Sequence, residues 1–231
     1  MFFFDINYLI YMIPAFLLMA LTSWYVKSSY SKWSQVRARS GLTGADAARR
    51  LISSSGLYGI RLEGVPGEMT DHYDPQHKVL RLSYDVANRP SVASLAIAAH
   101  ELGHAMQDAE NYFPLRLRGA LVPAVNIGSN LGWILIMAGL LLGFTGLAWL
   151  GVIIFSAGAV FALATLPVEF DASARAKRLL ADAGIIYGEQ ERAGVNAVLN
   201  AAALTYVAAL VAAVMQLLYY VGLVGGRSSR D

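Results

Sequence analysis

The feature that most limits the fold of this chain is a long segment without charge, because residues 121–166 contain no Asp, Glu, Lys, Arg or His. A single helix of that length would measure about 69 Å at 1.5 Å per residue, more than twice the roughly 30 Å hydrocarbon core of a bilayer. Within the segment, Gly143-Phe144-Thr145-Gly146 has glycines that favour a turn. We therefore predict two membrane spans joined by a tight turn at residues 143–146.

Two further segments are long and apolar enough to cross a membrane. The first covers residues 7–26 and contains Pro14, which membrane helices tolerate because neighbouring groups re-satisfy the backbone. The residues before it have no Lys or Arg and so lack the basic region of a secretory signal, and we expect this span to be retained. The last span covers residues 201–223. Only 15% of the chain is charged, against about a quarter in soluble domains, which agrees with four spans.

Residues 27–120 differ in kind, since they hold most of the charged residues and all four histidines. Leu80 and Leu82 alternate with Arg81 and Ser83, which is typical of a strand with one apolar face. We predict a small α+β domain here. Its expected elements are a helix over 45–51 with Thr43 as N-cap, a strand within 57–63, turns at 65–67 and 74–75, a strand over 78–83 and a helix over 91–109.

The sequence His100-Glu101-Leu102-Gly103-His104 has the spacing HExxH and falls within the last of these helices. Residues four apart lie on one face of a helix, so both imidazoles can reach one metal ion. Glu101 is turned about 100° from His100, so its carboxylate can bond a metal-bound water without binding the metal. Zinc lowers the pKa of that water towards about 7, and Glu101 can take its proton and later pass it to the leaving amine. The motif favours a zinc hydrolase over a helix that merely exposes three polar side chains.

A hydrolytic zinc site takes three protein ligands and leaves one position open. The chain has no cysteine, so the third ligand must be a histidine or a carboxylate. The better candidate is Glu169, just after the third span, and its rival is Asp171, two positions further on a different face of the same helix. A solvated helix face at the membrane edge is the alternative for both carboxylates. His72 and His77 lie in the turn-rich segment, where a surface position is the more typical interpretation.

Charge predicts which side of the membrane the motif occupies. Two spans separate the HExxH helix from Glu169, so both lie on the same side. Basic residues flank the membrane ends on that side: Lys27, Lys32, Arg37, Arg39, Arg116, Arg118, Arg175, Lys177 and Arg178. The positive-inside rule then places this side in the cytoplasm, although Arg227 and Arg230 oppose that orientation mildly. A net charge of only +2 without a long basic tract argues against a nucleic-acid partner.

With these motifs the sequence resembles the bacterial YugP-type membrane zinc metallopeptidases, a gluzincin-like neutral zinc peptidase family. The resemblance extends over residues 42–206 and keeps the same order. The segments that carry it are 42–45, 57–58, 70–75, 79–83, 98–101, 121–123, 126–130, 167–173 and 198–206.

The wider relatives implied by this resemblance are the membrane gluzincins of the heat-shock and CAAX-processing type. Their third ligand is the Glu of an E-F-x-A-D-like segment, which corresponds to Glu169 here. They place an Asp four residues after that Glu, where this chain has Ser173. The departure leads us to expect that Asp171 orients a ligand imidazole instead.

These observations predict a mainly α membrane protein with about four transmembrane helices and a small α+β, zincin-like soluble domain that carries HExxH on a helix. We expect a membrane-embedded zinc endopeptidase with one Zn²⁺ per chain, at the cytoplasmic face of the bacterial cell membrane, acting on peptides or on unfolded or membrane-protein segments. The predicted parts are an N-terminal transmembrane helix (1–26), a cytoplasmic metallopeptidase domain (27–120), a transmembrane hairpin (121–166), a cytoplasmic helical segment with the third ligand (167–200), a fourth transmembrane helix (201–224) and a tail (225–231).

Several alternatives stay open at this point. A non-hydrolytic, metal-stabilised scaffold or regulatory partner would have no need of Glu101, and a metal transporter should carry ionisable residues in its spans, which 121–166 lack. The strand over 78–83 fits an edge strand that pairs with substrate as well as it fits a core strand. The sequence does not choose among Tyr73, Tyr187 and Arg175 as oxyanion-stabilising residues. Oligomers and membrane partner proteins are equally open.

Overall fold

The computed structural model describes residues 6–228, so residues 1–5 of the predicted first segment and 229–231 of the predicted tail lie outside the described residues. The chain divides into two compact units, each built from pieces that are far apart in the sequence. The first unit comprises Met1–Thr22, Arg116–Leu166 and Thr205–Asp231, and the second comprises Ser23–Leu115 and Pro167–Leu204.

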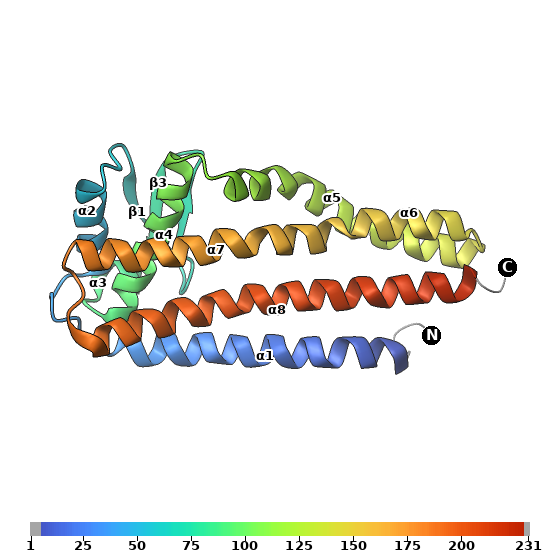
Figure 1. The fold of residues 1–231 in the computed structure, drawn as a ribbon, viewed down its shortest axis with the longest axis horizontal. Coiled ribbons are helices and arrows are strands. Elements are labelled where there is room, and N and C mark those ends of the chain that lie inside the picture. The colour runs from blue at the N-terminus through green and yellow to red at the C-terminus, as the bar shows by residue number, and fades with distance from the viewer. Residues whose placement is uncertain (1–5, 229–231) are drawn as a thin grey trace. The chain divides into compact units, whose positions relative to one another are not determined.

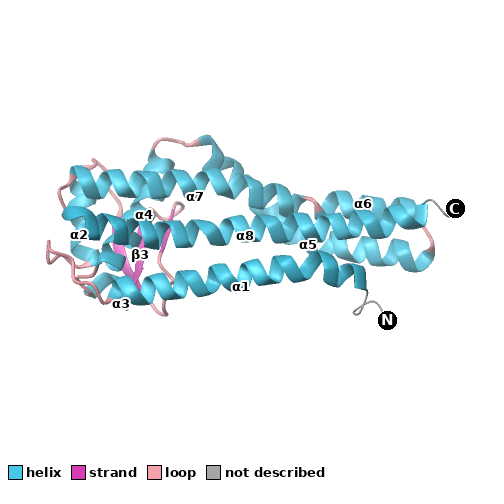
Figure 2. Cartoon of the chain, turned by 60° about the horizontal axis from the view of Figure 1, so that its bottom comes forward, coloured by secondary structure: helices cyan, strands magenta, loops and turns pink. Residues whose placement is uncertain are grey.

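Helices make up most of the described chain, and the strands form one small sheet (Figures 1 and 2). In chain order the elements are α1 (Ile6–Ser34), α2 (Gly44–Ser54), β1 (Arg61–Val65), β2 (His72–Asp74), β3 (Val79–Ser83), α3 (Tyr84–Asn88), α4 (Val92–Ala109), α5 (Phe113–Leu142), α6 (Thr145–Phe155), α7 (Ala157–Asp182) and α8 (Gly188–Ser228). The expectation of a mostly helical protein with a small mixed sheet is confirmed.

Four helical stretches within residues 6–228 are long and apolar enough to cross a membrane, which is the number predicted. They are Ile6–Ser34, Phe113–Leu142, Thr145–Asp182 and Gly188–Gly226. Each is longer than the predicted span, because the helix continues beyond the apolar residues into a polar segment. The third stretch consists of two helices, α6 and α7, which meet at Ser156.

In the first unit, the predicted turn joins α5 to α6 through Gly143 and Phe144. Gly143 has a φ of +68°, a conformation that glycine adopts without strain. The two helices then pack backbone to backbone, because a Cβ on Gly139 would lie only 2.4 Å from the Ala148 nitrogen. Small residues at such contacts are how apolar helices associate in a membrane, where no hydrophobic force drives them together.

The sheet of the second unit has the order β1-β3-β2, with β1 parallel and β2 antiparallel to β3. The strand predicted over 78–83 is therefore the central one, and its interpretation as an edge strand is wrong because both of its sides already have backbone partners. Leu80 and Leu82 are fully buried, as the alternation suggested, but Ser83 on the other face is buried as well.

The other strands differ from the prediction. The strand expected within 57–63 begins only at Arg61, since the chain turns at Gly59, whose φ is +96°. β2 lies mostly between the turns predicted at 65–67 and 74–75, and its three residues are too few for an alternating pattern to be visible in the sequence. Its pairing with β3 is a tertiary contact rather than a local preference.

Helices α2 and α4 begin where the sequence indicates, whereas the short helix α3 was not predicted. Thr43 caps α2 in a capping box: its Oγ accepts from the Asp46 backbone nitrogen at 3.1 Å, and the Asp46 carboxylate faces the Thr43 nitrogen. Ser91 caps α4 by accepting from the Ser94 nitrogen. Helix α4 packs against α2, α3 and the sheet, so it lies in the core of its unit (Figure 1).

Candidate metal centre

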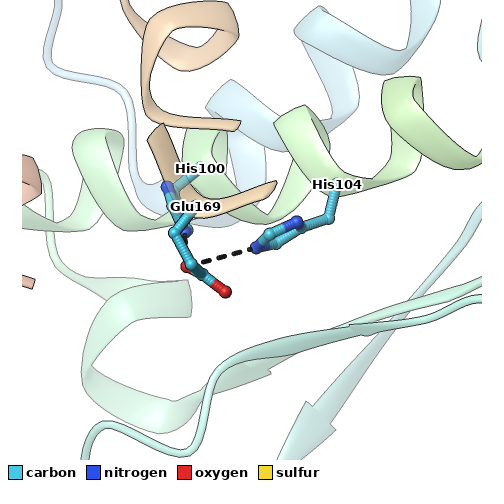
Figure 3. A group of neighbouring side chains, drawn as sticks. All are labelled: His100, His104 and Glu169. Carbon is cyan, nitrogen blue, oxygen red and sulfur yellow. Dashed lines mark ion pairs between the residues drawn. The ribbon is translucent and has the colours of Figure 1, made fainter. Parts of the chain in front are cut away.

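Helix α4 presents two imidazoles one turn apart. His100 and His104 have ring centroids 4.8 Å apart, and their planes are nearly perpendicular. Since most of α4 is buried against its neighbours, the two rings project from a backbone that is held on several sides. The Nε2 atoms of both rings face the same carboxylate (Figure 3).

That carboxylate belongs to Glu169 on α7, which is only 2% exposed. Its Oε2 lies 3.3 Å from His100 Nε2 and 3.7 Å from His104 Nε2, and Figure 3 shows the three side chains converging from two helices. Burying a carboxylate this deeply is costly unless a positive charge faces it. A bound cation at this point satisfies that requirement.

The arrangement fits a zinc ion. The three ligand atoms of His100, His104 and Glu169 lie within 4.8 Å of one another. Two atoms that each lie about 2.0–2.1 Å from one tetrahedral zinc are about 3.3–3.4 Å apart, close to the separations of Glu169 from the imidazoles. Two histidine nitrogens and one carboxylate oxygen also form the donor set of hydrolytic zinc sites, which keep a fourth position open.

Gly103, between the two histidines, lets α7 approach α4. A Cβ at this position would lie 2.4 Å from the Ala172 carbonyl oxygen and 3.0 Å from the Ala172 Cα. The backbones of the two helices are thus in direct contact, and Glu169 lies almost one turn before that contact on α7. Glycine at the fourth position of HExxH is therefore required by the helix contact that delivers the carboxylate.

We expect Gly103→Ala to weaken both the fold and the metal site. The added methyl group must push α7 away from α4, and overpacking of this kind costs about 1–3 kcal/mol. Thermal unfolding and chelator competition for zinc measure the two effects, and we expect at least a tenfold loss of zinc affinity. Gly119→Ala is the matched control, because a Cβ there meets nothing within 4 Å. Wild-type stability and affinity in Gly103→Ala would contradict the close contact.

Glu101 lies beside this group rather than in it. Its Oε2 accepts a hydrogen bond from the Tyr73 backbone nitrogen of β2 at 3.0 Å. Burial raises the pKa of Glu101, while the neighbouring His100 and His104 oppose that rise. The strand backbone thus orients a carboxylate that the HExxH spacing has placed next to the imidazoles.

A side chain that the sequence did not single out contacts His104 on its other nitrogen. The Gln107 Oε1 lies 3.0 Å from His104 Nδ1, and the Gln107 Nε2 donates to the Val168 carbonyl and to Asp171 Oδ2. Asp171 therefore reaches His104 through Gln107. Its spacing could have identified Gln107 in the sequence, because Gln107 follows His104 by three residues and so lies on the same side of α4.

Ser173 is the corresponding partner of the other imidazole. Its Oγ lies 3.3 Å from His100 Nδ1. This is the position where the resemblance implies an Asp, so the chain uses a hydroxyl there. With Nδ1 of both rings facing a polar side chain, both Nε2 atoms are left for a metal.

The remaining polar candidates are engaged elsewhere. His72 contacts the Thr70 carbonyl and His77 pairs with Asp74, and both histidines are exposed. Of the three candidates for oxyanion stabilisation, Tyr187 is 49% exposed and the Tyr73 hydroxyl donates to Asp108. The third, Arg175, is paired with two carboxylates, Asp171 and Glu110.

Four membrane-length helices and a buried His–His–Glu group define a membrane protein with a site that could hold a metal ion. The model of the family described as "Putative neutral zinc metallopeptidase" matches residues 8–225, and the chain belongs to this family. The resemblance stated from the sequence motifs is thereby confirmed.

Among curated proteins, the chain is similar to the "Putative membrane protease YugP" of Bacillus subtilis (strain 168). The two are 48% identical over 196 residues, which cover 85% of this chain and 87% of the Bacillus protein. No solved structure matches the chain. Family and relative together indicate a zinc protease in a membrane.

Proposed function

We propose that this chain is a zinc-dependent endopeptidase embedded in the membrane. The observation that carries the proposal is the carboxylate of Glu101, held by the Tyr73 backbone beside the His100–His104–Glu169 group. A metal that only stabilised the fold would need its ligands but no further carboxylate next to them. Glu101 therefore favours hydrolysis over the scaffold alternative.

In this proposal His100, His104 and Glu169 would hold one zinc ion. As a Lewis acid, the ion would polarise the substrate carbonyl and lower the pKa of a water molecule. Glu101 accepts the proton of the attacking water and passes it to the leaving amine. The Tyr73 nitrogen keeps the Glu101 side chain in one orientation, so the carboxylate does not have to be ordered when substrate arrives.

A cavity further along α4 supports a peptide substrate, although Glu101 and the His–His–Glu group do not line it. It measures about 220 Å³, and Tyr73, Ala105 and Asp108 are among its lining residues. Ala105 and Asp108 follow Glu101 by about one and two turns on the same face of α4, so the cavity lies along the face that carries the base. β2, not 78–83, is an edge strand of the sheet, and because its Tyr73 nitrogen already donates to Glu101, an extended peptide would pair with the rest of that edge. Peptides and unfolded or membrane-protein segments suit such a site.

We place this site at the cytoplasmic face of the bacterial cell membrane. The support is the excess of Lys and Arg on the side that carries HExxH and Glu169, together with the four candidate spans.

Single-cysteine labelling tests the orientation, and the natural chain contains no cysteine that would interfere. A membrane-impermeant maleimide should label Phe144→Cys in intact cells, because residue 144 lies in the exposed turn of the hairpin. Pro66→Cys, on the side of the proposed active site, should label only after lysis. Both variants should label fully in detergent, which controls for reactivity. The reverse pattern would place the active site outside the cell.

Metal content and casein cleavage by the purified, detergent-solubilised protein test the activity itself. We expect about one zinc per chain, as a site with one set of three ligands requires. The comparison that decides between hydrolysis and a scaffold is with the Glu101→Gln variant.

A further inference from the structure

Gln107 is completely buried between α4 and α7, and its amide has polar partners on both ends. The nitrogen lies 2.7 Å from the Val168 carbonyl oxygen and 2.9 Å from Asp171 Oδ2. The oxygen lies 3.0 Å from His104 Nδ1. All of these atoms belong to the second unit.

The orientation of this amide follows from the chemistry of its neighbours. A backbone carbonyl can only accept a hydrogen bond, and so can the Asp171 oxygen, because that oxygen also faces the guanidinium of Arg175, which has donors only. If the amide were flipped, its oxygen would face two acceptors in a buried site, which is costly. The Gln107 nitrogen must therefore face α7, and its oxygen must face His104.

Asp171 is itself held in place. Arg175 donates from Nε to Asp171 Oδ2 at 2.5 Å, and its Nη1 lies 2.7 Å from Glu110 Oε2. Arg175 is 9% exposed, whereas the side chain of Glu110 is 54% exposed. The carboxylate that orients Gln107 is thus anchored one turn further along α7.

An oxygen acceptor at Nδ1 dictates the tautomer of the imidazole. His104 must carry its proton on Nδ1, which leaves the lone pair on Nε2, the atom that faces Glu169. His100 is different, because its partner is the hydroxyl of Ser173, which can donate or accept. The Gln107 oxygen therefore fixes the tautomer of His104, whereas the Ser173 hydroxyl does not fix the tautomer of His100.

We propose, on the basis of the proposed zinc-peptidase function, that Gln107 and Asp171 are positioning residues that preset the metal-binding tautomer of His104. Asp171 acts only by fixing the Gln107 amide, and Gln107 acts by accepting the Nδ1 proton of His104. Because Asp171 works through Gln107, its contribution to zinc affinity must vanish when Gln107 loses its amide. This dependence separates the relay from a direct electrostatic effect of Asp171 on the metal.

A double-mutant cycle tests the relay, with zinc affinity measured by chelator competition at one fixed pH. We expect Gln107→Met to lower the affinity about 10–100-fold, the usual loss when the partner of a metal-binding histidine is removed. Asp171→Ala should lower it about tenfold in the natural chain and less than twofold in the Gln107→Met background. Gln107→Leu removes the amide in the same way, so it should reproduce both the loss of affinity and the loss of the Asp171 effect.

Asp182→Ala is the matched control, since Asp182 is an exposed carboxylate on the same helix, and we expect wild-type affinity there. Additive losses in Gln107→Met and Asp171→Ala would overturn the relay, and so would wild-type zinc affinity in Gln107→Met. If neither Gln107→Met nor Gln107→Leu folds, Asp171→Ala decides alone, and wild-type zinc affinity in that variant counts against the relay. Failure of the natural chain to bind zinc at all would instead refute the proposed function.

Discussion

Replacing Glu101 with Gln is expected to abolish cleavage of casein by the purified protein while zinc stays bound. The amide has nearly the shape of the carboxylate, and its oxygen can still accept the Tyr73 N–H, so the local structure should persist. It cannot take a proton from water, however. Because general acid–base groups contribute about 10²–10⁴-fold to a rate, we expect turnover to fall at least 100-fold.

The control for this variant is Glu189→Gln, the same change at an exposed position in the first turn of α8, which should retain full activity. Zinc content by atomic absorption and casein cleavage are measured on the same preparations. Full activity in Glu101→Gln would end the proposed mechanism. Loss of zinc from that variant would instead make Glu101 a ligand.

Glu169→Ala is expected to remove the metal. The Glu169 carboxylate supplies the one oxygen ligand of the three-residue group. Without it, two imidazoles remain, and they bind zinc far more weakly than three protein ligands do. The variant should therefore elute from size-exclusion chromatography in chelator-treated buffer with little zinc and no activity. Added zinc should restore little cleavage, because the ligand itself is missing.

Asp171→Ala is the informative comparison, because it removes a carboxylate two residues away on the same helix. Asp171 faces Gln107 and Arg175 rather than the Nε2 atoms, so this variant should keep its zinc and turn over more slowly. Full zinc content in Glu169→Ala would contradict the ligand assignment. So would an experimental structure with an Asp171 oxygen within about 2.2 Å of the metal and Glu169 turned away.

Much of the fold follows from local patterns in the sequence. The uncharged segment 121–166 predicted a helical hairpin, and the turn at Gly143 and Phe144 is where the glycines indicated. Thr43 and Ser91 cap α2 and α4 because a hydroxyl at that point satisfies a free backbone N–H whatever the tertiary structure. Apolar length and helix caps are properties of contiguous residues, so they are visible without a structure.

The sheet shows which features could not be predicted from local sequence patterns. β2 has three residues and owes its existence to pairing with β3. The position of β3 in the middle of the sheet depends equally on partners elsewhere in the chain. Neither the pairing nor the strand order is encoded in a short window, which is why the sequence left 78–83 open between an edge and a core strand and indicated only turns near β2.

The sequence by itself determined that His100, Glu101 and His104 share one helix and that the two imidazoles lie on one face, because helical spacing is local geometry. Only the tertiary structure decided that Glu169 rather than Asp171 faces those imidazoles, and that Gln107 connects Asp171 to His104. Both outcomes depend on how α7 is rotated and how closely it approaches α4, and Gly103 allows that approach. A helix's own sequence defines its faces, but its packing partners select which face is turned towards the site.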